Sequence, residues 1–165
     1  MDITKNNVEQ LRLINSTTLP VSYSDKFYRD LVEKSLPEYV KFATWNGFSV
    51  AAVCARVEPH ETVPDSFKLY IMTINVLAAY RRRGIGAKLL NHVLDTAKKD
   101  SSIIEVYLHV QTSNDDAKQF YLSNGFVQTD VIKGYYKRIE PPDCFLLKKS
   151  LKEGHEVGPV ASTEQ

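Results

Sequence analysis

Arg81-Arg82-Arg83-Gly84-Ile85-Gly86 is the stretch that decides the fold, because it joins a predicted strand to a predicted helix. A β-rich apolar run precedes it over residues 67–77, and a helical pattern follows it to about Lys98. Glycine lets backbone approach a ligand closely, and the first N–H groups of a helix have no partners inside it. Three arginines beside those donors predict an anion site. The alternative is a basic turn that only begins a surface helix.

The composition is that of an ordinary globular protein. With 165 residues, 43% of them hydrophobic, the chain is long enough for one domain with a real core. A net charge of +1 argues against general nucleic-acid binding, and no apolar run approaches the roughly 20 residues of a membrane span. Cys54 and Cys144 lie far apart, which favours reduced thiols in an intracellular protein. No cysteine–histidine cluster has metal-ligand spacing, so we expect no metal.

Hydrophobic periodicity predicts the elements before the basic turn. Two helices are expected, one over residues 6–17 and one that begins after Ser24, a good N-cap. Two β-rich runs follow over residues 39–44 and 48–57. Asn46-Gly47 between them is a strong hairpin signal.

The second half of the chain alternates strands and helices. A strand over residues 103–110 follows the helix that ends near Lys98, and a helix runs from Asn114 to a stop at Gly125. Strands are expected over residues 126–132 and 143–150. Two strand–helix–strand passages predict partly parallel pairing, in a mixed sheet with helices on both faces. From Lys152 the chain is polar without periodicity, so we expect a disordered tail after one domain of residues 1–151.

Two motifs in this order resemble the GCN5-related N-acetyltransferase superfamily. Arg81-x-x-Gly84-x-Gly86 resembles its acetyl-CoA motif, and Asn114-x-x-Ala117-x-x-Phe120-Tyr121-x-x-x-Gly125-Phe126 resembles its second signature. The resemblance implies the fold of that superfamily. This is an α/β (α+β) fold with a mixed, mostly antiparallel central sheet, one splayed parallel pair of strands, and helices on both faces.

Further segments resemble the NatE-type catalytic subunits within this superfamily, over about residues 2–151. They are Leu19-Pro20-Val21-Ser22-Tyr23, Leu69-Tyr70-Ile71-Met72-Thr73, Tyr107-Leu108-His109-Val110-Gln111 and Tyr135-Tyr136-Lys137-Arg138-Ile139-Glu140-Pro141. Three features depart from that family. Its short first strand is not found before the first helix, Leu19 stands where the family tends to have Phe, and Asn75-Val76 replace a Gly-Cys-like pair.

The resemblance implies transfer of acetyl from acetyl-CoA to the α-amino group of protein N-termini, with preference for an initiator Met followed by a hydrophobic residue. Nascent-chain N-termini would then be partners, together with the auxiliary and catalytic subunits of the NatA complex near the ribosome. The resemblance also implies a cytoplasmic location, with the nucleus as an alternative, and no direct contact with nucleic acid or membrane.

Strand alternation brings out the candidate catalytic residues. Tyr70, Met72 and Ile74 should point to one side of their strand, and Tyr107 and His109 to one side of theirs. If the two strands are neighbours, Tyr70 and His109 meet over one face. The resemblance implies that they are the catalytic pair and deprotonate the amine through ordered water. Taken alone, base rates favour a packed tyrosine and a hydrogen-bonded core histidine.

The expected acetyl-CoA contacts lie at the end of a strand, in the basic turn and in the second signature. They are Ile74, Asn75, Val76, Leu77, Arg81, Arg82, Arg83, Gly84, Ile85, Gly86, Ala87, Asn114 and Tyr121. A backbone N–H within residues 74–77 should polarise the acetyl carbonyl. The resemblance implies that Tyr121 hydrogen-bonds or protonates the leaving thiolate. Asn114 could contact the pantetheine arm, cap its helix, or do both.

Two aromatic loops are expected to hold the peptide, with Met72 beside their apolar wall. They contribute Leu19, Pro20, Val21, Tyr23, Tyr135, Tyr136, Lys137, Arg138 and Ile139. The alternative is two loops that only pack on the core. Two other functions stay open: a lysine ε-amine or small-molecule acetyltransferase, and a low-activity binding subunit of the NatA/NatE complex. The intact cofactor turn favours an active enzyme.

Overall fold

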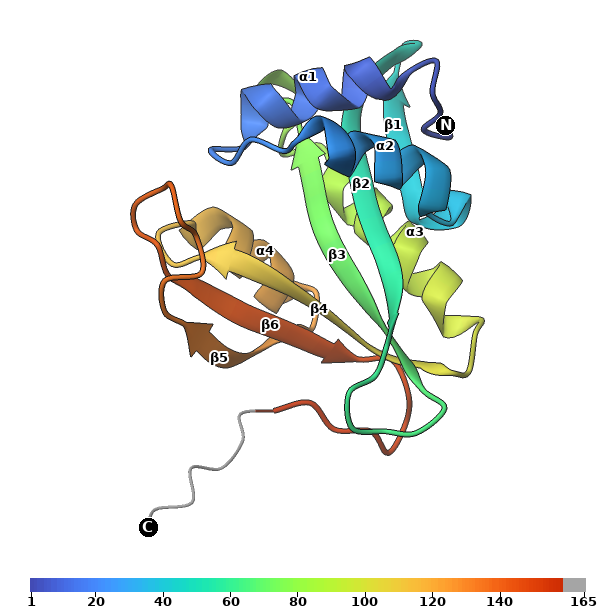
Figure 1. Ribbon diagram of the computed structural model, residues 1–165, viewed down its shortest axis with the longest axis vertical. Helices are drawn as coiled ribbons and strands as arrows, with labels where there is room; N and C mark the ends of the chain where they lie inside the picture. The colour runs from blue at the N-terminus through green and yellow to red at the C-terminus, as the bar shows by residue number, and fades with distance from the viewer. Residues whose placement is uncertain (159–165) are drawn as a thin grey trace. The chain divides into compact units, whose positions relative to one another are not determined.

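The computed structural model describes residues 1–158, which fall into two compact units. Unit 1 comprises Met1–Val57 and Ile71–Asp100, and unit 2 comprises Glu58–Tyr70 and the chain from Ser101. One six-stranded sheet has the order β1-β2-β3-β4-β6-β5 (Figure 1), and β3 (Phe67–Val76) contributes to both units. The predicted mixed α/β sheet, mostly antiparallel with one parallel pair, is confirmed.

Unit 1 begins its sheet with the predicted hairpin. β1 (Val40–Trp45) and β2 (Phe48–Pro59) pair antiparallel up to Trp45 opposite Phe48. Asn46 and Gly47 make the turn with φ values of 48° and 83°. Positive φ at both central residues is typical of the type I′ turn, whose twist matches that of the two strands.

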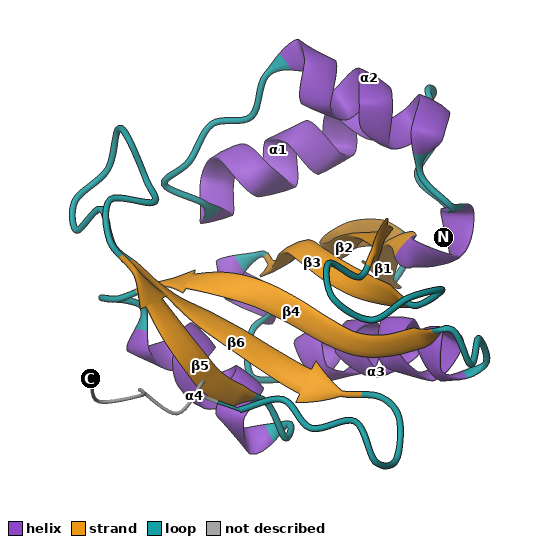
Figure 2. Cartoon of the chain, turned by 60° about the horizontal axis from the view of Figure 1, so that its bottom comes forward, coloured by secondary structure: helices purple, strands orange, loops and turns teal. Residues whose placement is uncertain are grey.

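Helices cover both faces of the strands in unit 1 (Figure 2). α1 (Val8–Thr18) and α2 (Asp25–Lys34) lie on one face, and α3 (Ile85–Lys98) lies on the other. Between α1, α2 and the strands lies a buried apolar core made of Leu11, Ile14, Tyr28, Leu31, Val40, Phe42, Ala52 and Cys54. Ser24 caps α2 as predicted, since its hydroxyl accepts from the Phe27 N–H at 3.2 Å. The helix predicted after the basic turn buries an apolar stripe of Ile85, Leu89, Leu90, Val93, Leu94 and Ala97. Two short 3₁₀ turns, η1 (Pro37–Tyr39) and η2 (Ala78–Tyr80), were not expected.

Unit 2 contains β4 (Ile103–Gln111), α4 (Asp115–Ser123), β5 (Val127–Ile132) and β6 (Cys144–Ser150). The first half of β3 pairs parallel to β4, as the first strand–helix–strand passage predicts. The second passage gives no such pair, because β6 lies between β4 and β5 and is antiparallel to both. Periodicity could not show this insertion, since it concerns register between distant segments.

One face of the unit 2 sheet is covered by α4. The Lys118 ammonium lies 4.1 Å from the ring centroid of Phe145 in β6, and Lys149 donates to the carbonyl of Asn124 at 2.8 Å. Side chains alternate along a strand, so Tyr107 and His109 lie on the opposite face. That face holds the polar groups described below.

Residues near both ends of the described chain contact strands. Asp2 forms an isolated antiparallel bridge with Lys41, and the Phe42 N–H donates to the carbonyl of Met1 at 2.8 Å, so residues before α1 do pair with β1. The expected disorder from Lys152 falls partly on residues 159–165, which lie outside the described residues. Residues 152–158 are described, and His155 contacts Glu105 there. Within residues 1–158 no helix combines the length and apolarity that crossing a membrane requires.

Candidate active site

Tyr70 and His109 meet over the face of the unit 2 sheet that α4 leaves uncovered. Tyr70 of β3 is in register with Tyr107 of β4, and His109 follows two residues later. The Tyr70 hydroxyl oxygen lies 3.3 Å from His109 Nδ1 and 3.5 Å from the hydroxyl oxygen of Tyr135. The structure thus brings together the two residues that strand alternation singled out, and adds Tyr135 from the predicted second peptide loop.

Ring packing fixes the orientation of these polar groups. The Tyr70 ring stacks on Tyr107 with centroids 4.7 Å apart and 12° between planes. The His109 ring stacks on Tyr135 at 4.4 Å and 20°. Tyr70 meets His109 edge to face at 5.6 Å. Because the ring faces are held by neighbours, the hydroxyl of Tyr70 and the edge of the imidazole have defined positions.

The surroundings of His109 favour its neutral form. Burial lowers the pKa of His109, and the negative charge of Glu58 partly opposes this by raising it. Glu58 also accepts a hydrogen bond from the Tyr107 hydroxyl. A neutral imidazole can accept a proton at neutral pH, so the geometry and the charge suit a general base. Glu58 was not singled out from the sequence, since a glutamate before Pro59 reads as the start of a loop.

The basic turn in unit 1 has the geometry of a helix N-terminus open to a ligand. Gly84 is the N-cap of α3 in the left-handed region, with φ 76°, and no side chain caps the helix. The first N–H groups of α3 at Ile85, Gly86 and Ala87 belong to this open end. A 14-residue helix adds partial positive charge there. These features suit a phosphate group.

The three arginines differ in their surroundings. Arg81 Nε donates to the carbonyl of Val76 at 2.9 Å, which ties the turn to the end of β3. The Arg83 guanidinium lies 5.2 Å from the ring centroid of Trp45, on the β1–β2 hairpin. Arg82 has a positive φ of 61°. Arg81 and Arg83 therefore help to shape the turn.

At the end of β3 the structure narrows the predicted cofactor contacts. The Asn75 amide donates to Asn15 Oδ1 at 2.9 Å, and the Asn15 amide donates to the Tyr28 hydroxyl at 3.2 Å. Asn15 and Asn75 are both buried, so the Asn75 side chain belongs to an internal network. The Leu77 N–H donates to the Val50 carbonyl at 2.9 Å. The Leu77 N–H is therefore engaged within the sheet, and an oxyanion donor among residues 74–76 stays a prediction.

The second signature places two candidates in unit 2. Asn114 caps α4, since its Oδ1 accepts from the Ala117 N–H at 3.2 Å. Tyr121 is buried and lies 5.4 Å from Phe126, centroid to centroid. Burial raises the pKa of Tyr121, so its hydroxyl stays protonated and can act as a donor.

The first predicted peptide loop lies between α1 and α2 in unit 1. Leu19 ends α1 in an extended conformation, as Pro20 after it predicts. Tyr23 stacks on Phe27 at 4.3 Å, and Tyr23 and Met72 both pack against the core of unit 1. Pro20 is exposed and Val21 half-buried, so this loop offers an apolar edge.

The second predicted peptide loop lies in unit 2. Tyr135 is 38% exposed although its ring stacks on His109, so part of the ring is open to a ligand. The Tyr136 N–H donates to the Pro142 carbonyl at 2.8 Å, and Lys137 Nζ donates to the Gly134 carbonyl at 3.0 Å. These bonds close the loop on itself. Arg138 is exposed and Ile139 is half-buried.

Comparison with known proteins gives one consistent picture. A model described as the acetyltransferase (GNAT) family matches residues 8–126. N-alpha-acetyltransferase 50 of Danio rerio is 48% identical over 151 residues, which cover 92% of this chain and 87% of the relative. The probable N-acetyltransferase san of Drosophila melanogaster is 42% identical, with 92% and 79% covered.

Solved structures agree with these relatives. Arabidopsis thaliana Naa50, in complex with the bisubstrate analogue CoA-Ac-MVNAL, is 44% identical and superposes with a TM-score of 0.82 over 91% of this chain and 96% of its own. The NatC complex bound to Gag peptide and CoA contains a chain with a TM-score of 0.82 and 22% identity, which shows the shared fold alone.

Proposed function

Because the chain belongs to the GNAT family of acetyltransferases, we propose that it transfers acetyl from acetyl-CoA to the α-amino group of protein N-termini. The observation that carries this proposal is the 3.3 Å contact between the Tyr70 hydroxyl and His109 Nδ1. This contact supports the proposal because a hydroxyl and an imidazole nitrogen lie side by side, in a chain that is 48% identical to an N-alpha-acetyltransferase 50.

The proposed reaction is a direct transfer. The α-amine nitrogen attacks the thioester carbonyl carbon, its proton passes through water to Tyr70 and His109, and the carbon–sulfur bond breaks. Free α-amines have a pKa near 8, so a modest base suffices at neutral pH. Neutral His109 fits that role. Tyr121, protonated because of its burial, would donate to the leaving thiolate.

Acetyl-CoA would be held by its pyrophosphate at the start of α3. The uncapped N–H groups after Gly84 and the charges of Arg81 to Arg83 support this assignment. Asn114 remains a candidate for the pantetheine arm beside its observed capping role. The Asn75 side chain takes no part, since its amide is bonded inside unit 1.

The substrate we propose is a peptide that begins with Met followed by a hydrophobic residue. The relative from Arabidopsis thaliana is bound to an analogue written CoA-Ac-MVNAL, which begins with such a pair. Exposed Tyr135 in unit 2 suits an apolar side chain beside polar backbone, and so, by itself, does the apolar edge at Leu19 to Tyr23 in unit 1. We extend the proposal to docking on the NatA complex and to action in the cytoplasm; both free cysteines are buried, as suits a reducing compartment.

The test is acetylation by the full chain with radiolabelled acetyl-CoA over peptides that vary in their first two residues. A Met-Leu peptide should be the best substrate, and the same peptide with a blocked N-terminus and an internal lysine should be poor. Acetylation of the blocked peptide alone would overturn the α-amine assignment. Binding of acetyl-CoA without acetylation of any peptide would instead favour the low-activity binding subunit.

A further inference from the structure

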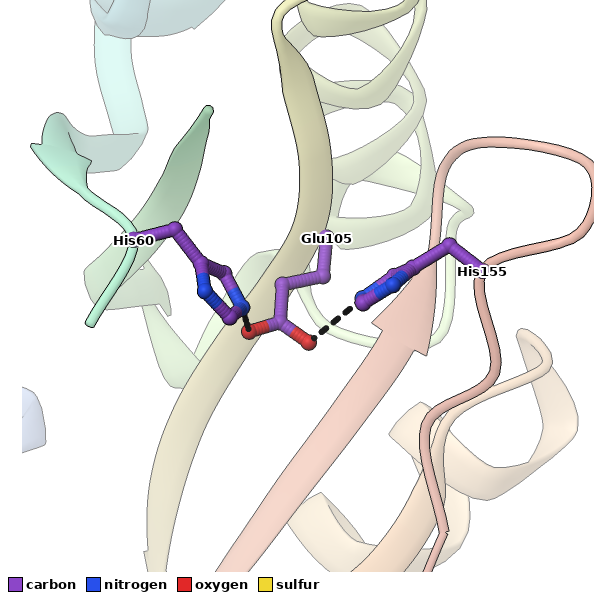
Figure 3. A group of neighbouring side chains, drawn as sticks. All are labelled: His60, Glu105 and His155. Atoms are coloured by element: carbon purple, nitrogen blue, oxygen red, sulfur yellow. Dashed lines mark hydrogen bonds and ion pairs between the residues drawn. The ribbon is translucent and has the colours of Figure 1, made fainter. Parts of the chain in front are cut away.

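Outside the proposed acetyl-transfer site, three side chains of unit 2 converge on one carboxylate (Figure 3). His60 follows β2, Glu105 lies in β4, and His155 follows β6. Their ligand atoms all lie within 4.8 Å of one another. We propose that this group, the Glu105 cluster, is a binding site for a divalent transition-metal ion of the Zn²⁺ class.

The donor set is the first argument. Two imidazoles and one carboxylate are among the common three-ligand sets of zinc, with a fourth position open to water. His60 Nε2 lies 2.7 Å from Glu105 Oε1, and His155 Nε2 lies 3.2 Å from Oε2. Ligand atoms of a tetrahedral zinc ion are about 3.3 Å apart, so these two pairs are close to the spacing of two ligands of one ion.

The state of one buried oxygen of Glu105 also supports an ion here. Glu105 Oε1 accepts no hydrogen bond within residues 1–158, although His60 Nε2 is so close. The two atoms lie side by side, as two ligands of one ion do. A buried carboxylate needs compensation, and a cation between these atoms would supply it.

Exposure defines a route for the ion. The Glu105 and His60 side chains are 3% and 6% exposed, whereas that of His155 is 21% exposed. An ion would reach the carboxylate past His155. The bound ion would link His60, in the loop before β3, and His155, after β6, to Glu105 in β4.

The surroundings of His60 predict a change of tautomer on binding. Its Nδ1 accepts from the N–H groups of Thr62 and Val63 at 3.2 and 3.1 Å, so the proton of the metal-free ring is on Nε2. Coordination through Nε2 requires that proton to move to Nδ1. A proton at Nδ1 would face the Thr62 and Val63 N–H groups, so both hydrogen bonds must break and the turn at residues 60–63 must rearrange on binding.

Lys148 provides an internal competitor for the ion. Its Nζ lies 3.9 Å from Glu105 Oε1, the same oxygen that His60 Nε2 approaches. The ammonium balances part of the carboxylate charge and would repel a dication. Removing it should strengthen binding, which a nonspecific surface histidine site would not show.

The experiment is a Co²⁺ titration, followed by Zn²⁺ competition against a chelating dye, on the full chain without an affinity tag. Wild-type protein should bind one equivalent below about 10 μM with the visible absorption of tetrahedral cobalt. His155→Ala should weaken binding at least about tenfold, and Lys148→Met should tighten it several-fold. His92→Ala is the matched control and should leave affinity unchanged, because His92 lies in unit 1 and contacts the Glu38 carbonyl.

Equal affinity in wild type and His155→Ala would overturn the proposal, and so would binding weaker than about 100 μM. His155 follows the last strand, so its replacement leaves the sheet core in place. The readouts need no acetyl transfer. Loss of the proposed enzymatic function would therefore leave this result unaffected, and the reverse also holds.

Discussion

Replacing Tyr70 by Phe isolates the proposed catalytic hydroxyl from its structural role. The Phe ring can keep the stack on Tyr107 at 4.7 Å. The substitution removes the hydroxyl and with it the 3.3 Å contact to His109 Nδ1 and the 3.5 Å contact to Tyr135, the second of which is too long to contribute much. A neutral hydrogen bond of this kind stabilises by about 1 kcal/mol. For a chain of this size, that corresponds to a fall in Tm of roughly 2 to 4 °C.

The expected effect on rate is much larger. If the hydroxyl takes part in proton transfer, its removal should lower kcat by about 10² to 10⁴. This corresponds to roughly 2.7 to 5.4 kcal/mol in the activation free energy. KM for acetyl-CoA should stay near the wild-type value, since the cofactor turn lies in unit 1 and is unchanged.

The assay is steady-state transfer of radiolabelled acetyl to a Met-Leu peptide, with thermal unfolding of the same samples. Tyr135→Phe is the matched control, because it also removes a hydroxyl near Tyr70 and keeps the ring on His109. It should raise KM for the peptide more than it lowers kcat. If Tyr70→Phe keeps kcat within about threefold of wild type, the hydroxyl has no role in proton transfer.

Four further predictions concern the charge of Glu58, the pH dependence of stability, the backbone at Gly84 and the buried Asn15–Asn75 pair. Glu58→Gln removes the charge that raises the pKa of His109, so the acid limb of kcat/KM should move to lower pH; an unmoved limb would contradict this. The pKa of His109 in the folded protein lies below its unfolded value of 6.5. The stability that His109 contributes is therefore present above pH 6.5 and is lost as the pH falls through the pKa of the folded state. Urea unfolding at several pH values would measure this loss. Gly84→Ala, at φ 76° and with nothing within 4 Å of the added Cβ, should cost about 1 to 2 kcal/mol in backbone strain and weaken acetyl-CoA binding in calorimetry; equal affinity would remove the turn from the cofactor site. Asn75→Val removes the donor to the buried Oδ1 of Asn15 and should lower the free energy of unfolding by about 1 to 3 kcal/mol, measured by thermal unfolding. The affinity for acetyl-CoA should stay unchanged.

Local signals in the sequence predicted the elements well, and they predicted that Tyr70 and His109 share one face. Asn46-Gly47 demands positive φ at both residues, so the hairpin and its position follow from the sequence alone. Side-chain alternation put Tyr70 and His109 on one side of their strands. Only the pairing of β3 with β4 was needed to bring them together.

Features that depend on pairing between distant segments could not be predicted in the same way. The position of β6 between β4 and β5 leaves no trace in either strand's pattern. Asn15 looks like a polar residue on a helix surface until Asn75, sixty positions later, meets it in the interior. His60 and His155 were scattered residues in the sequence, and only the fold places both beside Glu105.

The central position of β6 has a consequence for synthesis of the protein. β4 and β5 both take their antiparallel partner from Cys144–Ser150, the last strand within residues 1–158. During translation, the hydrogen-bonding edge of β4 stays open until that strand leaves the exit tunnel, because no earlier segment can fill the place. Unpaired edges of this kind invite intermolecular association. The nascent chain should therefore be most vulnerable to aggregation when stalled just before Cys144, and an arrest-peptide series across this boundary would show the edge close.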